Sequence, residues 1–206
     1  LVATANAEMV MLANENPTLH SILNNASLVV PDGAGILWAA ERQGEHVPER
    51  VTGVDVTKEL FKVAATHQIP VYCLGAAPGV AQRAIDNVSA QVGVLNIAGI
   101  HDGFFDSAEE QEIIKSIAES KAKLVFVALG VPKQEQWIAE KLSHLDGVVA
   151  IGIGGSFDVL AGNIPRAPEW MQQNRLEWLY RLYLEPQRIG RMLAIPKFMW
   201  TVIRNK

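Results

Sequence analysis

Six short apolar runs, each ended by small or polar residues, constrain the fold of this chain more than any other feature. The runs lie at residues 1–3, 28–30, 71–74, 94–98, 124–129 and 148–151. They are continuous in polarity rather than alternating, and helix-length segments separate several of them, for example 56–67, 78–91, 107–120 and 133–142. Such strands are typical of a parallel sheet that is covered on both sides. The sequence therefore predicts an α/β fold with a doubly wound, Rossmann-like, mostly parallel sheet and helices on both faces.

The composition agrees with a single globular domain in a reducing compartment. The 206 residues are 49% hydrophobic and 19% charged. Cys73 is the only cysteine and lies inside an apolar run, which excludes an intramolecular disulfide and favours the cytoplasm. No uninterrupted apolar stretch reaches the roughly 18 to 20 residues of a membrane-spanning helix. Because the chain opens at Leu1 rather than at a methionine, we expect a preceding segment that contributes to the fold or to oligomer contacts.

The charge is distributed unevenly along the chain. The net charge is −4, but residues 175–206 carry +5 and residues 1–174 carry −9. Apolar side chains, Trp178 and Trp200 among them, alternate with the cations of this tail. The pattern predicts an α/β domain at 1–174 and a basic, amphipathic helical appendage at 175–206 that binds an anionic membrane surface, placing the protein peripherally on the inner face of the plasma membrane. A terminal helix docked on the body is the alternative.

Polar and small residues gather where the predicted strands end. Thr4 and Asn6 follow the first run, Asp32 the second, His101 and Asp102 the fourth, Gly130 and Gln134 the fifth, and Asp158 the sixth. Taken singly, each has a simpler explanation as part of a turn, a loop or a helix cap. Because open parallel sheets bind ligands beyond the carboxyl ends of their strands, the joint placement predicts an active site at that edge.

Several familiar sites are absent from the sequence. The glycine groups at 75–79 and 152–155 do not form G-x-G-x-x-G, and no P-loop sequence occurs. Residues 154–158 approach a nucleophile elbow but lack its second flanking glycine. The five histidines lack the spacing of metal ligands. These absences disfavour dinucleotide-dependent, P-loop and serine-hydrolase chemistry.

Five segments, in this order, resemble the WecG/TagA/CpsF family of bacterial glycosyltransferases and are closest to its TagA-type members. They are Thr-Ala-Asn-Ala-Glu at 4–8, Val-Pro-Asp-Gly-Ala-Gly at 30–35, Glu-Arg-Val-Thr-Gly-Val-Asp at 49–55, Gly-Val-Pro-Lys-Gln-Glu at 130–135 and Gly-Gly-Ser-Phe-Asp at 154–158. The closing stretch 176–188 fits the same family, so the resemblance covers essentially the whole chain. Ala5 and Ala7 depart from the prolines that are frequent in the first motif, which changes the stiffness of the loop more than its chemistry.

The resemblance implies an inverting glycosyltransferase. It would move N-acetylmannosamine from its UDP donor to the 4-hydroxyl of N-acetylglucosamine on undecaprenyl diphosphate, in the synthesis of the wall teichoic acid linkage unit. A UDP-N-acetylmannosaminuronic acid donor, or another UDP-sugar, is the alternative within the family. A sugar-nucleotide oxidoreductase or epimerase and a non-catalytic lipid- or nucleotide-binding module are the rivals from other classes. A homo-oligomer is a further expectation, whereas nucleic acid is not an expected partner.

The resemblance, together with the chemistry of inverting transfer, suggests roles for the residues at the strand ends. Asp32 matches the family's catalytic aspartate and would accept the proton of the acceptor hydroxyl. Thr4 is the second expected catalytic residue; it and Asn6 would orient the sugar through hydroxyl and amide hydrogen bonds, and Gln134 would do so from the opposite side. Gly130 is a further expected substrate-binding position.

Cations are expected to bind the departing diphosphate. No Asp-x-Asp pair, by which many nucleotide-sugar enzymes hold a divalent ion, occurs in the chain. We therefore expect no cofactor and no metal, with charge stabilised by arginines and helix N-termini. Arg181, Arg188 and Arg191 match the arginines of the family's C-terminal appendage. Arg50 is expected to bind a phosphate or a sugar oxygen, with a surface ion pair as the alternative, and Asp158 completes the expected binding residues.

Overall fold

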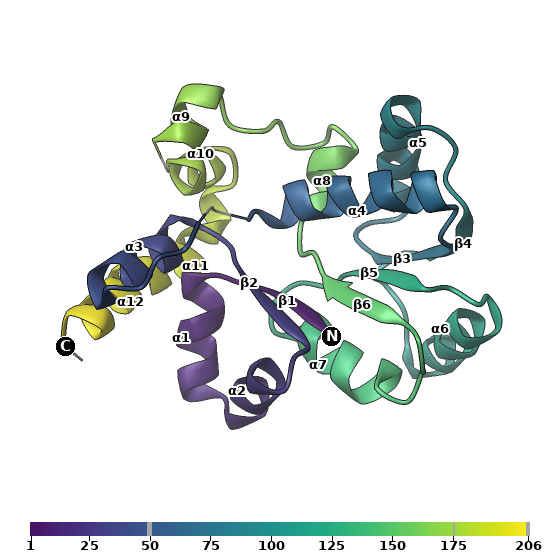
Figure 1. Ribbon diagram of the computed structural model, residues 1–206, viewed down its shortest axis with the longest axis horizontal. Coiled ribbons are helices and arrows are strands. Elements are labelled where there is room, and N and C mark those ends of the chain that lie inside the picture. Colours follow the sequence, from purple (N-terminus) through teal and green to yellow (C-terminus); the bar gives the residue numbers. More distant parts are fainter. Residues whose placement is uncertain (49–50, 175, 205–206) are drawn as a thin grey trace.

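A computed structural model describes residues 1–48, 51–174 and 176–204, without the side chain of Arg188. Within this part of the chain, six parallel strands form one sheet in the order β2-β1-β6-β5-β3-β4 (Figure 1). The strands are β1 (Val2–Ala5), β2 (Leu28–Pro31), β3 (Val71–Gly75), β4 (Ile97–His101), β5 (Leu124–Ala128) and β6 (Val149–Gly152). The predicted parallel α/β sheet is confirmed.

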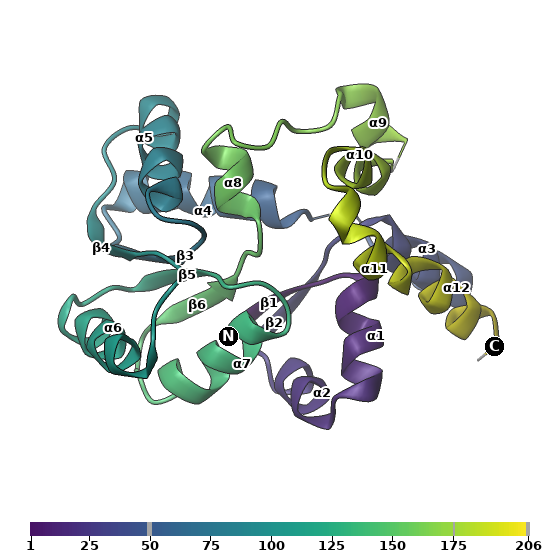
Figure 2. The same ribbon diagram turned by 180° about the vertical axis from the view of Figure 1, so that it is seen from behind.

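Helices cover both faces of the sheet. One face carries α4 (Gly53–His67), α5 (Val80–Val92) and α8 (Ser156–Leu160), and the other carries helices that include α6 (Ser107–Glu119) and α7 (Lys133–Trp137) with the π-helical turn Ile138–Leu142, as Figures 1 and 2 show. The remaining helices are α1 (Ala7–Glu15), α2 (Pro17–Asn24), α3 (Ala34–Gln43), α9 (Glu169–Gln173), α10 (Glu177–Leu184), the 3₁₀ turn Pro186–Arg188, α11 (Ile189–Met192) and α12 (Ala194–Arg204).

Polar side chains start several of these helices. Asn6, Asn16 and Thr52 each accept a hydrogen bond from the backbone N–H three residues further on, which satisfies a donor that has no partner within the helix. Asp106 forms a reciprocal capping box at the start of α6. Two of these capping residues, Asn6 and Thr52, also line a cleft at the carboxyl ends of the strands. The residues that begin α1 and α4 therefore also shape that cleft.

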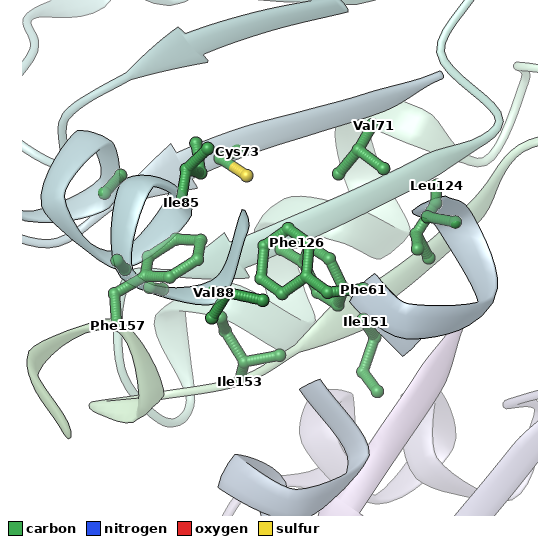
Figure 3. Close-up of a cluster of buried hydrophobic side chains, with 14 of the residues drawn as sticks. Phe61, Val71, Cys73, Ile85, Val88, Leu124, Phe126, Ile151, Ile153 and Phe157 are labelled. Carbon is green, nitrogen blue, oxygen red and sulfur yellow. The ribbon is translucent and has the colours of Figure 1, made fainter. Parts of the chain in front are cut away.

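The central strands are apolar on both faces because successive residues serve two different cores. Cys73 and Phe126 point toward α4, α5 and α8, where Phe61 stacks on Phe126 with ring centroids 4.7 Å apart (Figure 3). Tyr72 and Val125 point the opposite way and pack against α6 and α7. Burial also raises the pKa of the Cys73 thiol, which leaves it protonated and unreactive.

The fourth strand was predicted at 94–98, and this placement is wrong because the strand begins three residues later. Val94 is 80% exposed and belongs to the connection from α5, whereas β4 runs over Ile97–His101 and pairs with β3. Gly99 is paired with Tyr72 of β3, and only glycine fits there because a Cβ at this position would overlap the Tyr72 ring. His101 is consequently the last residue of the strand rather than part of the loop that follows it.

The C-terminal tail folds back onto the N-terminal part of the sheet. Helix α12 packs on α1 and α3, and Phe198 joins Ala7 and Ala39 in a small core of their own. Docking on the body, the alternative raised from the sequence, is therefore what the described tail does. Its outer side still exposes Leu193 and Trp200. Among the described residues, none of the helices combines the length and the apolar character needed to cross a membrane.

Candidate active site

A cleft of about 500 Å³ opens at the carboxyl ends of β1, β2, β5 and β6. The sheet edge contributes one wall, which contains Thr4, Asn6, Asp32, Gly130 and Gln134. The tail contributes the facing wall with residues from α10, α11 and α12. Residues that are almost two hundred positions apart in sequence thus enclose one cavity.

Asp32 follows β2 directly and lies at the N-terminus of α4. Its backbone N–H donates to the carbonyl of Ala5 over 2.7 Å, which continues the pairing of β2 with β1. Its carboxylate Oδ2 accepts a hydrogen bond from the backbone N–H of Gly53 at 3.4 Å. The positive end of a 15-residue helix and this N–H both stabilise a negative charge on Asp32.

Thr4 and Asn6 are held by backbone partners. Thr4 lies within β1, is buried, and donates its hydroxyl hydrogen bond to the carbonyl of Gly152 over 3.2 Å. Asn6 Oδ1 accepts from the backbone N–H of Met9 at 2.9 Å and caps α1. Both side chains line the cleft. These bonds fix their positions, and the Thr4 bond also holds β1 against β6.

Gln134 is almost completely buried although it lines the cleft. Its Oε1 accepts from the backbone N–H of Gly154 at 3.0 Å, and its Nε2 donates to Glu135 Oε1 at 2.7 Å. Glu135 has no exposed surface, and this burial raises its pKa to about 7. Gln134 therefore connects the loop after β5 to the loop after β6.

Two of the four expected arginines are placed at the cleft by the structure. Arg181 of α10 and Arg191 of α11 line it, and Arg191 Nε lies 3.7 Å from the carboxylate of Glu8 on α1. Arg50 lies outside the described residues, and so does the side chain of Arg188. Among the described residues, the cations that line the cleft therefore belong to the tail.

Asp158 is not brought to the cleft. It lies on the short helix α8, where its carboxylate accepts a hydrogen bond from Asn163 Nδ2 at 3.2 Å. His101 and Asp102 are also absent from the lining, because β4 is the strand furthest from β1 on that side of the sheet. The position of Asp158 at the end of a strand run was therefore not sufficient to place it in the site.

Glu135 and the pair of Arg166 with Asp55 were not identified from the sequence. Glu135 carried no sign of its burial, although it stands next to Gln134 in a quoted motif. Arg166 was not singled out either: its guanidinium donates to both carboxylate oxygens of Asp55 over 2.6 and 2.7 Å and lies 3.9 Å from Glu177. The hydrogen bond with Asp55 raises the pKa of Arg166. A signal for this pair was the acidic residue in the first turn of α4, three positions after its cap Thr52.

The cleft has a polar floor and an apolar side. Trp38 of α3, Trp178 of α10 and Met199 of α12 line the same cleft as the carboxylate and amide groups of the sheet edge. A carboxylate held at a helix N-terminus can accept a proton, and arginines can stabilise an anionic leaving group. Within the described residues, no three His, Cys, Asp or Glu side chains are grouped as metal ligands.

Comparisons with known proteins extend over the same residues. The model of the family described as "Glycosyl transferase WecG/TagA/CpsF family" matches residues 1–206. A protein of Bacillus subtilis is 35% identical over 206 residues, which are 100% of this chain and 80% of that protein. A protein of Bacillus spizizenii is 37% identical over 100% of this chain and 79% of its own length, and one of Staphylococcus aureus is 33% identical over 100% and 80%. All three are named N-acetylglucosaminyldiphosphoundecaprenol N-acetyl-beta-D-mannosaminyltransferase.

Proposed function

Because this chain belongs to the WecG/TagA/CpsF family of glycosyltransferases, we propose that it transfers N-acetylmannosamine from UDP-N-acetylmannosamine to N-acetylglucosaminyl-diphosphoundecaprenol. The names of its relatives specify this acceptor and this sugar. The observation that carries the proposal is the position of Asp32 in a cleft that also contains Arg181 and Arg191. A general base can activate the acceptor hydroxyl, and cationic groups can stabilise the departing diphosphate in inverting transfer from a nucleotide-diphosphate sugar.

In the proposed reaction, Asp32 accepts the proton of the acceptor's 4-hydroxyl as that oxygen attacks C1 of N-acetylmannosamine. The new C1–O bond forms on the face opposite the departing UDP, so the configuration at C1 inverts. The bond between C1 and the β-phosphate oxygen breaks, and its electron pair leaves with UDP. Arg181 and Arg191 offset the charge that develops on the diphosphate. Asn6 and Gln134 supply amide groups to the sugar.

The direct test is UDP release by the purified chain with a short-chain N-acetylglucosaminyl diphospholipid. We expect release with UDP-N-acetylmannosamine and this acceptor together, and no comparable release when the acceptor is omitted. If UDP is released in the presence of the acceptor only when UDP-N-acetylmannosaminuronic acid is the donor, the alternative donor is favoured. Absence of UDP release with every UDP-N-acetylhexosamine would favour a non-catalytic binding module. Tight NAD binding would favour a sugar-nucleotide oxidoreductase.

Transfer is proposed to need no divalent ion. The support for this is the set of cations on the tail wall and the lack of an Asp-x-Asp pair in the sequence. UDP release should therefore continue at an unchanged rate in EDTA. Loss of release on chelation, restored by Mg²⁺ or Mn²⁺, would contradict this part of the proposal.

The acceptor in the relatives' names is carried on a polyprenyl lipid, so we also propose that the chain acts at an anionic membrane surface on the cytoplasmic side. The tail supports this assignment, because it is basic and its outer side exposes Tyr183, Ile189, Leu193 and Trp200. Contact between two copies of the chain is the competing use of the same apolar surface. Sedimentation with anionic vesicles, compared with the oligomeric state in solution, separates the two.

A further inference from the structure

Glu135 is a buried acidic group that the proposed reaction does not use. Its side chain has no exposed surface and is separated from the cleft by Gln134. One carboxylate oxygen, Oε1, accepts from Gln134 Nε2 at 2.7 Å, and the other, Oε2, has no hydrogen-bond partner among the described residues. Burying a carboxyl group that is only half satisfied destabilises the fold. Such a group calls for an explanation other than stability.

Glu135 and the backbone N–H of Gly154 contact opposite ends of the Gln134 carboxamide, and both favour the same orientation of it. A carboxamide has a donor end and an acceptor end of nearly the same shape, so packing alone does not distinguish its two orientations. An ionised carboxylate only accepts hydrogen bonds, and a protonated one still accepts through the oxygen without the proton. The nitrogen of Gln134 is therefore held toward Glu135, and its oxygen is held toward the backbone N–H of Gly154.

Gly152 allows the pair to lie this close to the sheet. A Cβ at Gly152 would lie 2.6 Å from Gln134 Nε2 and 2.8 Å from Glu135 Oε1, closer than real side chains approach. The glycine at the end of β6 thus leaves space for two polar side chains from the loop after β5. In the glycine group Gly152-Ile-Gly154-Gly155, Gly152 thus leaves space for the two side chains and Gly154 donates a hydrogen bond to Gln134.

The same loop leads to Asp32. A Cβ at Gly53 would lie 3.4 Å from Ser156 Oγ, 3.7 Å from Asp32 Oδ2 and 3.8 Å from the carbonyl oxygen of Ile153. Gly53, at the start of α4, therefore lies close to both the loop after β6 and the Asp32 carboxylate. A shift of Gly154 would be transmitted to the surroundings of the carboxylate.

We propose that Glu135 is a positioning residue: it fixes the orientation of the Gln134 carboxamide and, through the Gly154 N–H, the loop 153–156 beside Asp32. This proposal rests on the function proposed above, because Gln134 and this loop line the cleft in which the sugar would bind. Glu135 itself is not a catalytic residue, since it has no surface on the cleft. Its effect on turnover passes through Gln134.

A double-mutant cycle tests whether Glu135 acts through Gln134. We expect Glu135→Gln to lower kcat/KM for UDP release by about tenfold, since a substituted amide no longer enforces one orientation. In the Gln134→Ala background the same change should have almost no further effect. Multiplicative losses would overturn the proposal, because they would show that Glu135 acts independently of Gln134. Glu140→Gln, an exposed glutamate on the following turn, removes the same charge and should leave kcat/KM unchanged.

A spectroscopic measurement tests the same contact without relying on the activity. In the ¹⁵N-labelled full chain, the Gln134 side-chain amide resonances, identified by their loss in Gln134→Ala, should move in Glu135→Gln and stay in place in Glu140→Gln. Unmoved resonances in Glu135→Gln would overturn the proposal. If no donor supports UDP release, the resonance shifts still show whether Glu135 contacts Gln134. In that case the absence of release contradicts the proposed function and not the positioning role of Glu135. If Glu135→Gln does not fold, Glu135→Met, which has a similar length, replaces it in both arms.

Discussion

Asp32 is the residue on which the proposed chemistry depends most directly. Its position between the end of β2 and the start of α4 comes from two local rules, strand pairing with Ala5 and the free N–H groups of a helix start. Asp32→Asn keeps the size of the side chain and removes its basicity. We expect kcat to fall by on the order of a hundredfold or more, in line with the contribution of a general base.

The control for this substitution is Asp146→Asn, which changes an exposed carboxylate in the loop that precedes β6. Both variants should show the thermal unfolding of the parent chain, and only Asp32→Asn should lose turnover. Near-normal UDP release by Asp32→Asn would remove this residue from the role of base.

Glu135 predicts a dependence of stability on pH. Burial raises its pKa from 4.5 to about 7, so the folded chain binds this proton more tightly than the unfolded chain does. The corresponding stability is fully present below about pH 4.5 and is lost as the pH rises through 7, a change of about 3 kcal/mol. Glu135→Gln should remove this dependence. Denaturant unfolding of both proteins at pH 5 and pH 8 measures it, and parallel changes in the two would contradict the prediction.

At the scale of elements, Arg166 connects the body to the tail. It binds Asp55 in the first turn of α4 and approaches Glu177 in the first turn of α10, the helix that carries Arg181. A bidentate pair of hydrogen bonds from arginine to carboxylate fixes the relative orientation of the two side chains as well as their distance. The beginning of the tail is thereby oriented by the helix that begins beside Asp32.

Replacing Arg166 should loosen this connection. In Arg166→Met we expect faster proteolytic cleavage between Ala167 and Leu176 and a kcat/KM for UDP release that is lower by about tenfold, because Arg181 is less well placed. The matched control is Arg83→Met, which removes a single hydrogen bond to Asn163 on the body. Equal cleavage rates in the two variants would show that Arg166 does not hold the tail.

The elements that could be predicted from the sequence are those whose pattern follows from local rules. Continuous apolar runs located five of the six strands of the described sheet because each of these strands is buried on at least one face or pairs along its whole length. The fourth strand was misplaced because its position is defined by pairing with β3, in which Gly99 lies opposite Tyr72, 27 residues earlier in the chain. The packing of α12 on α1 and α3 likewise depends on contacts that no local pattern contains.

The same distinction applies to the site. The position of Asp32, Gln134 and Gly130 at one edge follows from the direction of parallel strands, so the sequence could predict it. Whether a polar residue near a strand end turns toward the cleft or away from it depends on the geometry of its loop, and Asp158 turns away. The burial of Glu135 depends on the space beside Gly152, which only the folded sheet reveals.

At the scale of the whole molecule, we predict that the tail has two functions. Truncation after Asn174 removes the wall that contains Arg181, Arg191 and Met199, together with the exposed apolar and basic surface. We expect the truncated chain to lose both turnover on a soluble short-chain acceptor and sedimentation with anionic vesicles. Replacing Arg181, Arg188 and Arg191 together should be more selective, lowering turnover while the apolar residues retain part of the vesicle binding.

Comparing the parent chain, the truncation and the triple substitution in both assays separates the two functions. Full soluble-acceptor turnover by the truncated chain would reduce the tail to a membrane anchor. Unchanged sedimentation of the truncated chain would show that the attraction to the vesicle lies elsewhere.

The order in which the cleft is assembled has a consequence for the synthesis of the protein. Thr4 and Asn6 are translated well before Met199 in the opposite wall, which lies more than 190 positions later in the chain. At elongation rates of about 5 to 20 residues per second, this interval lasts roughly 10 to 40 seconds. The nascent chain accordingly carries Asp32, the proposed proton acceptor, before the cleft around it is complete, and we expect an interrupted translation product to be inactive even if its sheet folds.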